Sequence, residues 1–198
     1  MDPQLVPPAA DKDKATFSDG RNVTDFYKSW ELEEIKADLD RRRTPLVNIC
    51  MNLSSDFNKS SVIRSNNAFL GRKVYIVGKK RYDVRGAVGT RHYEHVEHSE
   101  ELAPVIEGLI AEGYLVCPVD NIPGYEPQNL FDVELPEKVA FLYGEEGLGL
   151  SAEAIELCNG PMIQVQMYGS VRSLNVAQCA AVLMAEYSRQ HHQLLTGE

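Results

Sequence analysis

Short apolar runs alternate with helical patterns from residue 46 to the end of the chain. The apolar runs predict five strands, at residues 46–51, 74–77, 114–119, 138–143 and 162–167. The segments between and after them predict helices at residues 59–70, 99–112, 152–158 and 175–190. Continuous apolar strands are typical of a sheet that helices cover on both faces. The pattern therefore predicts an α/β fold with a mostly parallel sheet.

The N-terminal part of the chain does not follow this alternation. Residues 1–20 are rich in Pro, Asp, Lys and Ala without periodicity, which predicts a disordered tail. Residues 21–44 predict a helix with Thr24 as its N-cap, ended by Pro45. We therefore expect a tail, an N-terminal helical extension and one domain over residues 45–198.

The composition is that of an ordinary soluble protein, with 43% apolar and 25% charged residues. No apolar run is long enough to span a bilayer, and the N-terminus has no apolar signal-peptide core, so we expect no membrane partner. The four cysteines are widely spaced and form no C-x-x-C. This usage favours reduced thiols and a cytoplasmic location.

The net charge of −9 argues against a nucleic-acid partner until its distribution is considered. Residues 72–91 contain seven Lys or Arg and a single acid, Asp83, a local net charge of +6. A basic stretch on an acidic body can supply phosphate contacts at one place. The alternative is a solvated charged loop without a ligand.

Three segments with unusual polar residues follow predicted strands, where ligands bind on open α/β sheets. They are FNKSSVIRSNN at 57–67, YGEEGLGLS at 143–151 and YGSVRSLN at 168–175. The glycine order G-x-x-G-x-G is not a dinucleotide fingerprint, and no G-K-[ST] follows it. Each segment also has an interpretation without a ligand: a solvated or ion-paired arginine, a tight turn and a helix cap.

A histidine cluster raises the question of a metal site. His92, His95 and His98 are spaced by three, but they precede a predicted helix rather than lie within it. Nothing nearby in the sequence supplies cysteine ligands or the supporting residues of a structural zinc site. We therefore predict no metal.

Together, the three segments resemble the signature motifs of the SpoU (TrmH-type) branch of the SPOUT RNA methyltransferases. Asn58, Ser60 and Arg64 occupy the places of an Asn, a small residue two positions on and an Arg six positions on. GEEGLGLS is similar to G-N-E-G-x-G-L-S, with Glu145 in place of Asn. VQMYGSVRSLNV is similar to I-P-M-x-G-x-x-x-S-L-N-V, with Gln166 in place of Pro.

The resemblance covers about residues 45–190 and implies a 2′-O-ribose methyltransferase that uses S-adenosylmethionine. It also implies a C-terminal trefoil knot, a rare exception to unknotted topology, and a homodimer with active sites at the subunit interface. The positions that match the family's catalytic residues are Asn58, Arg64, Glu146, Ser173 and Asn175. Those that would line the cofactor pocket are Leu142, Gly144, Val165, Met167 and Leu174.

Within this resemblance, an arginine suits the role of general base poorly, because its pKa lies above ~12. We expect Arg64 to anchor an adjacent RNA phosphate and to lower the pKa of the ribose hydroxyl electrostatically. Asn58 and Asn175 would orient the substrate and cofactor loops. Glu146 would hold Arg64 or the backbone of the third segment in place.

The basic stretch then becomes an RNA-binding element. The residues expected to contact phosphates are Lys79, Lys80, Arg81, Arg85 and Arg91, with Tyr82 or Tyr93 available for stacking. Ser60, where many ribosomal-RNA members carry Gly, leans toward tRNA as the substrate rather than ribosomal RNA. The lack of a separate N-terminal RNA-binding domain leans the same way.

Two other functions compete with this prediction. The first is a non-catalytic RNA-binding protein on the same fold, against which the intact catalytic positions argue. The second is a nucleotide-dependent oxidoreductase, which would need a glycine fingerprint after the first strand. LVNICMNLSSDF has none.

Overall fold

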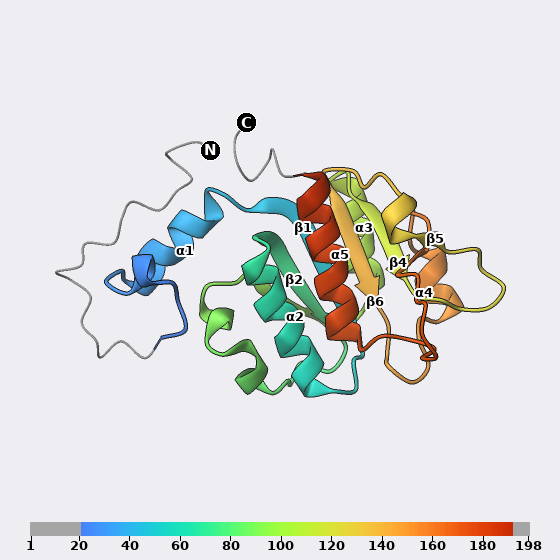
Figure 1. The fold of residues 1–198 in the computed structure, drawn as a ribbon, viewed down its shortest axis with the longest axis horizontal. Helices are drawn as coiled ribbons and strands as arrows, with labels where there is room; N and C mark the ends of the chain where they lie inside the picture. The colour runs from blue at the N-terminus through green and yellow to red at the C-terminus, as the bar shows by residue number, and fades with distance from the viewer. Residues whose placement is uncertain (1–20, 192–198) are drawn as a thin grey trace.

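The computed structural model describes residues 21–191, so the predicted tail at 1–20 lies outside the described residues. Within that range seven parallel strands form one sheet in the order β3-β2-β1-β6-β4-β7-β5, which confirms the α/β class (Figure 1). The strands are β1 (Thr44–Met51), β2 (Gly71–Val77), β3 (Val96–Ser99), β4 (Leu115–Val119), β5 (Gln128–Asn129), β6 (Val139–Tyr143) and β7 (Ile163–Gln164). The helices are α1 (Leu32–Asp40), α2 (Asp56–Ala68), α3 (Ala103–Ala111), α4 (Ala152–Glu156) and α5 (Val176–Gln190). Short 3-10 turns are η1 (Asp25–Tyr27), η2 (Val84–Ala87), η3 (Thr90–His92) and η4 (Leu130–Asp132).

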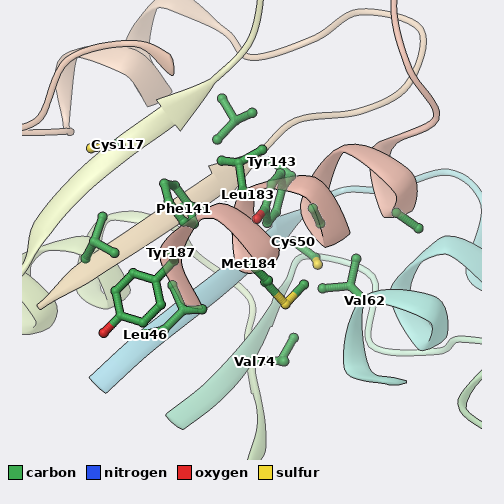
Figure 2. Close-up of a cluster of buried hydrophobic side chains, with 14 of the residues drawn as sticks. Leu46, Cys50, Val62, Val74, Cys117, Phe141, Tyr143, Leu183, Met184 and Tyr187 are labelled. Atoms are coloured by element: carbon green, nitrogen blue, oxygen red, sulfur yellow. The ribbon is translucent and has the colours of Figure 1, made fainter. Parts of the chain in front are cut away.

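Helices cover both faces of the sheet, which explains why its central strands are apolar throughout. α2 and α5 lie in front of the sheet and α3 lies behind it in the view of Figure 1. Along β6, Phe141 and Tyr143 point into the core cluster on the α2 and α5 side, whereas Ala140 and Leu142 point into the cluster on the α3 side. Figure 2 shows the first cluster, to which α5 contributes Leu183, Met184 and Tyr187.

Two of the seven strands, β3 and β5, lie where the apolar pattern predicts none. β3 reads VEHS and is an edge strand with no fully buried residue, so no apolar run marks it. β5 has two residues, lies within the long segment 121–137 between β4 and β6, and pairs with β7. Both strands owe their existence to pairing with a neighbour, which the local sequence does not encode.

The single helix predicted after Thr24 is in fact two elements, η1 and α1. Thr24 precedes η1, and its side chain makes no capping hydrogen bond. α1 begins after Glu31, whose backbone N donates to Glu34 Oε2 at 2.9 Å. The rings of Phe26 and Tyr27 in η1 pack on each other and on that of Trp30, which lies between the two elements. The apolar spacing that predicts one helix therefore spans a 3-10 turn, a short connection and α1.

No helix among residues 21–191 is long and apolar enough to cross a membrane. The knot implied by the resemblance stays a prediction.

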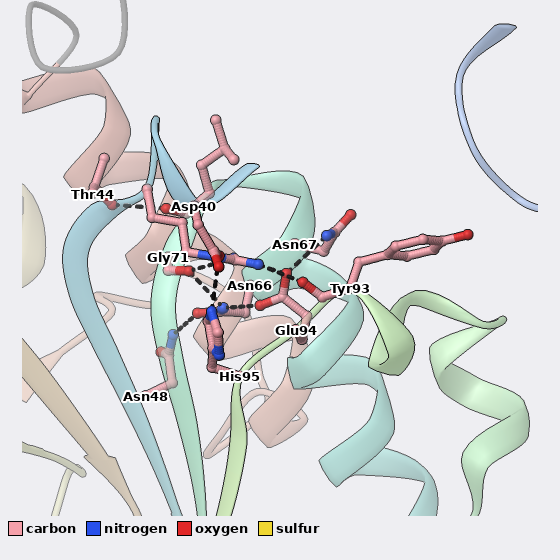
Figure 3. Close-up of polar contacts among 11 residues, drawn as sticks. Asp40, Thr44, Asn48, Asn66, Asn67, Gly71, Tyr93, Glu94 and His95 are labelled. Atoms are coloured by element: carbon pink, nitrogen blue, oxygen red, sulfur yellow. Dashed lines mark hydrogen bonds and ion pairs between the residues drawn. The ribbon is translucent and has the colours of Figure 1, made fainter. Parts of the chain in front are cut away.

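A buried chain of polar side chains runs from β6 across β1 and α2 to the segment before β3. Tyr143 Oη donates to Asn48 Oδ1 at 2.8 Å, and Asn48 Nδ2 donates to Asn66 Oδ1 at 2.9 Å. Asn66 Nδ2 donates to Glu94 Oε2 at 2.5 Å, and Arg43 Nη1 donates to Glu94 Oε1 at 2.9 Å. Figure 3 shows the part of this network around Glu94, which is only 5% exposed. Burial raises the pKa of Glu94, and the neighbouring Arg43 offsets part of that effect.

Replacing Glu94 by Ala should lower the free energy of unfolding by about 3–5 kcal/mol, because Arg43 loses its buried carboxylate partner. Urea denaturation measures this. The matched control is Glu97→Ala on β3, which removes an exposed carboxylate from its pair with the half-buried Lys73 and should cost at most about 1 kcal/mol. Equal losses of unfolding free energy in the two variants would show that the buried network adds no more stability than the pair on β3.

Candidate active site

A cavity of about 530 Å³ lies beyond the carboxyl ends of β4, β6 and β7. Its position is the one that open α/β sheets use for ligands, and its size suits a small organic molecule. The lining residues come from the loop after β4, the glycine-rich loop after β6 and the segment between β7 and α5. They are Val119, Asp120, Asn121, Tyr143, Gly144, Glu145, Glu146, Gly147, Gly149, Ile163, Gln164, Val165, Met167, Arg172, Ser173, Leu174, Asn175, Val176 and Cys179.

Glu146 is the acceptor that joins two of the predicted segments at the edge of this cavity. Its Oε2 accepts hydrogen bonds from the backbone N and the Oγ of Ser54, both at 2.8 Å. Its Oε1 accepts from Asn58 Nδ2 at 2.7 Å and from Ser55 N at 3.3 Å. The loop after β6 is thereby tied to the first turn of α2.

These donors keep the Glu146 carboxylate ionised. Partial burial alone would raise its pKa, but the hydrogen bonds from Asn58 and Ser54 outweigh that effect and lower the pKa to about 2. A carboxylate that accepts several donors is more stable ionised than protonated. Glu146 is therefore a fixed negative charge at neutral pH.

Asn175 brings the third segment to the same place. Its Oδ1 accepts from the backbone N of Ala177 and of Gln178, which caps α5. Its Nδ2 donates to Asn58 Oδ1 at 3.1 Å. One amide side chain thus caps a helix with its oxygen and positions the first segment with its nitrogen, which a pure cap would not require.

The glycine-rich loop is held against β4 by Asp120. Asp120 Oδ2 accepts from Leu150 N at 2.9 Å, and a Cβ on Gly149 would lie 2.7 Å from the same oxygen. Gly149 also has a φ of +71°, which favours glycine. Across the turn, a Cβ on Gly144 would lie 2.6 Å from the carbonyl carbon of Gly149. Both glycines are required by close approach of backbone and carboxylate.

Asn121 holds the third segment, because its Nδ2 donates to the carbonyl oxygen of Arg172 at 2.7 Å. Asp120 and Asn121 were not predicted as site residues. The signal available was their place directly after the apolar run at 114–119, at a strand end on the same edge as the other segments.

Most of the predicted site residues meet at the cavity. Glu146, Ser173 and Asn175 line it, and Asn58 reaches it through its bonds to Glu146 and Asn175. Of the five residues predicted to bind the cofactor, four line it: Gly144, Val165, Met167 and Leu174.

Two predicted residues lie elsewhere. Leu142 is fully buried in the core cluster on the α3 side, because alternation along β6 turns it away from Tyr143. Arg64 is exposed on α2 and is not among the residues lining the cavity. Six positions along a helix place it on a different face from Asn58. Glu146 thus bonds to Ser54, Ser55 and Asn58 within this chain, not to Arg64.

The predicted RNA-contacting cations are exposed, whereas the two rings predicted to stack are buried or half-buried. Lys79, Lys80, Arg81, Arg85 and Arg91 are all exposed. Arg85 is engaged by Asp83, with Nη2 to Oδ2 at 2.5 Å. Tyr93 is only 6% exposed and packs against α1, and Tyr82 is half-buried against the main core, so neither ring is fully exposed.

The three histidines do not converge. His95 contacts Asp40 at 2.8 Å, His98 contacts the carbonyl oxygen of Gly78 at 2.7 Å, and His92 lies beside Arg91. In residues 21–191 no three His, Cys, Asp or Glu side chains are close enough to hold a metal ion.

A model of the SpoU rRNA Methylase family matches residues 45–185. The chain belongs to this family. The match includes all three segments and confirms the resemblance seen in the sequence.

Two curated relatives of the SpoU chain share one name. A tRNA (guanosine(18)-2′-O)-methyltransferase of Mus musculus is 26% identical over 193 residues, which are 91% of this chain and 12% of the relative. The protein of that name from Escherichia coli K12 is 25% identical over 156 residues, 75% of this chain and 66% of the relative. This chain therefore spans only part of the length of either relative.

Solved structures share the fold. The A. aeolicus TrmH/SpoU tRNA modifying enzyme matches with a TM-score of 0.74 at 21% identity, over 83% of this chain and 85% of that one. The SpoU methyltransferase AviRb from Streptomyces viridochromogenes, in complex with the cofactor AdoMet, matches with a TM-score of 0.67 at 25% identity, over 79% and 65%.

Replacing Glu146 by Gln should destabilise the protein by about 1 kcal/mol at pH 7, a value reduced for the exposure of this side chain. A carboxyl pKa lowered on folding stabilises the native state above the unfolded pKa of about 4.3, and this stabilisation is lost as pH falls toward 2. The difference between wild type and variant should therefore shrink between about pH 4.5 and pH 2. Chemical denaturation at pH 7, 4 and 3 measures it.

Asn58→Ala is the companion variant. It removes the shortest donor to the carboxylate, so the native Glu146 pKa should rise toward its unfolded value and the variant should lose less stability than the wild type as pH falls below about 4.5. A wild-type advantage over Glu146→Gln that stays constant with pH would contradict the assignment of a lowered Glu146 pKa.

Proposed function

We propose that this SpoU-family chain is an S-adenosylmethionine-dependent RNA 2′-O-ribose methyltransferase. The observation that carries the proposal is the Glu146–Asn58–Asn175 cluster, which joins the three family segments beside one cavity. The names of the two tRNA (guanosine(18)-2′-O)-methyltransferases support both the reaction and tRNA as the substrate.

The cavity suits S-adenosylmethionine. Apolar side chains such as Val165 and Leu174 supply walls for a flat base, and the glycine-rich loop brings backbone close to them. Three carboxylates line the cavity against one guanidinium: Asp120, Glu145 and Glu146 against that of Arg172. An acidic lining favours a ligand that carries a positive charge, as a sulfonium with an amino group does. The AdoMet complex of AviRb supports the same cofactor.

The chain's own residues would hold the nucleophile in line with the methyl group. When bound, S-adenosylmethionine supplies an electrophilic methyl group at its sulfonium. Ser173 and Asn175 lie on the cavity wall, where they would contact the ribose. Glu146 fixes Asn58, and Asn58 fixes Asn175, so this wall is set before substrate binds. Such preorganisation lowers the barrier by removing freedom from the reacting groups.

We further propose that the enzyme is a homodimer, with Arg64 of one subunit placed at the cavity of the other. Three large apolar side chains beside cavity-lining residues are strongly exposed: Leu148 at 85%, Tyr168 at 91% and Val171 at 60%. An exposed apolar patch at the rim of a site favours a protein contact. Arg64, which makes no ion pair within residues 21–191, would complete the site by holding the RNA phosphate and lowering the pKa of the hydroxyl.

We place the protein in the cytoplasm. Its four cysteines are free thiols, two of them buried, and burial raises the pKa of Cys50 and Cys117 to about 12. Reduced, unreactive thiols suit a reducing compartment.

Labelled methyl transfer from S-adenosylmethionine tests the reaction. With total tRNA and ribosomal RNA offered separately, we expect label in tRNA, and mapping should find it on a ribose 2′-oxygen. Ser173→Ala should reduce transfer at least about tenfold, because a positioned hydroxyl in an active site is worth that much. Label on a base, or RNA binding without cofactor affinity and transfer, would contradict the proposal; the second outcome identifies a non-catalytic RNA-binding protein.

Mixed dimers test the shared site. Arg64→Ala and Ser173→Ala subunits, each weakly active alone, are co-expressed with different tags and purified as the heterodimer. If Arg64 acts across the interface, one of the two sites is intact and about half of the wild-type activity returns. If Arg64 acts within its own subunit, each site keeps one defect and no activity returns.

A further inference from the structure

An apolar surface lies next to the candidate site, outside the residues that line the cavity. Phe57 is 54% exposed in the first turn of α2, one residue before Asn58. Val84 and Val88, at the two ends of η2, are 38% and 43% exposed. We refer to Phe57, Val84 and Val88 as the platform.

The two elements of the platform are packed tightly. A Cβ on Gly86 would lie 2.2 Å from Ser60 Oγ and 3.3 Å from Phe57 Cε2, so glycine is required for η2 to approach α2 this closely. Val88 has a φ of +46°, which is strained for a β-branched residue. Strain of this kind is retained where the surroundings hold a residue in place, often at functional sites.

A buried lysine fixes the basic loop beside the platform. Lys59 is 0% exposed, and its Nζ donates to the carbonyl oxygens of Lys79 at 3.2 Å and Arg81 at 3.3 Å. Nζ also lies 3.5 Å from Asp56 Oδ1. Lys79 itself pairs with Asp56 at 3.6 Å. The first turn of α2 therefore carries the aromatic ring and anchors the loop that presents the exposed cations.

We propose that the platform is a stacking surface for an unpaired base of the RNA, with Phe57 as its ring. This inference rests on the proposed function and adds a base-binding site to it. An aromatic face beside phosphate-binding cations is how proteins hold single-stranded RNA, and stacking accepts any base because every base has a π-face. Phe57 takes the role that sequence reasoning gave to Tyr82 or Tyr93. Because Phe57 precedes Asn58, a base stacked there lies next to the ribose to be methylated.

Affinity for two polyanions tests the platform. Poly(A) carries phosphates and bases, whereas heparin carries charge without bases. Phe57→Ala should weaken poly(A) binding roughly 5- to 100-fold, the usual range for one stacked base, and leave heparin binding unchanged. Phe57→Trp should restore poly(A) binding. The triple variant Lys79→Ala, Lys80→Ala, Arg81→Ala should weaken both ligands, because it removes charge from the neighbouring loop.

Phe131 provides the matched control. It is 53% exposed on η4, which packs against α5, so Phe131→Ala removes an equally exposed ring and should change neither affinity. Equal effects of Phe57→Ala on poly(A) and heparin, or failure of Trp to rescue, would overturn the stacking assignment. A change in oligomeric state on sedimentation of Phe57→Ala would overturn it too and make the platform a subunit contact.

The platform and the proposed function can fail separately. Wild-type protein that transfers methyl groups to tRNA while Phe57→Ala binds poly(A) normally would refute the platform alone. Wild-type protein that neither binds tRNA nor transfers a methyl group would refute the proposed function.

Discussion

The geometry of the candidate site depends on hydrogen bonds to the Glu146 carboxylate. It accepts from the loop after β1 and from the first turn of α2, although it follows β6 some ninety residues later in the chain. Asn58 in turn accepts a hydrogen bond from Asn175, which caps the start of α5. Without an ionised acceptor at this point, the first turn of α2 would lose the hydrogen bonds that fix it to the loop after β6. The parallel sheet brings the segments to one edge, and hydrogen bonding to one charge sets their geometry.

The sheet makes this arrangement possible because its two buried faces exclude polar side chains that have no hydrogen-bond partner. Both faces are buried against helices, so along β6 every side chain is committed to one core or the other. Polar groups are then confined to strand ends, or to interior positions where each finds a partner. Asn48 is the interior case, bonded on one side by Tyr143 and on the other to Asn66. A single unpaired amide there would cost about 1–3 kcal/mol.

Sequence patterns predicted the central strands and the three segments because those features are local: apolar runs, glycines with special φ and residues at fixed spacing. They missed β3, in which three of the four residues are polar and which is defined by its pairing with β2. They placed Leu142 at the cavity, whereas strand alternation turns it into the opposite core. They offered Tyr93 for stacking, although its ring packs against α1 from far earlier in the chain. These predictions failed because each feature depends on contacts between residues that are far apart in the sequence.

α2 shows how these constraints act on one element. Its C-terminal half is held through Asn66 and Asn67, which donate to the buried Glu94. Its first turn is held through Asn58 to Glu146, and Lys59 binds the basic loop to it. With both ends fixed by polar contacts and the apolar face buried against the sheet, the helix has little freedom to rotate. Its remaining face, which carries Arg64, is therefore presented in a set direction, as the proposed sharing of the site between subunits would require.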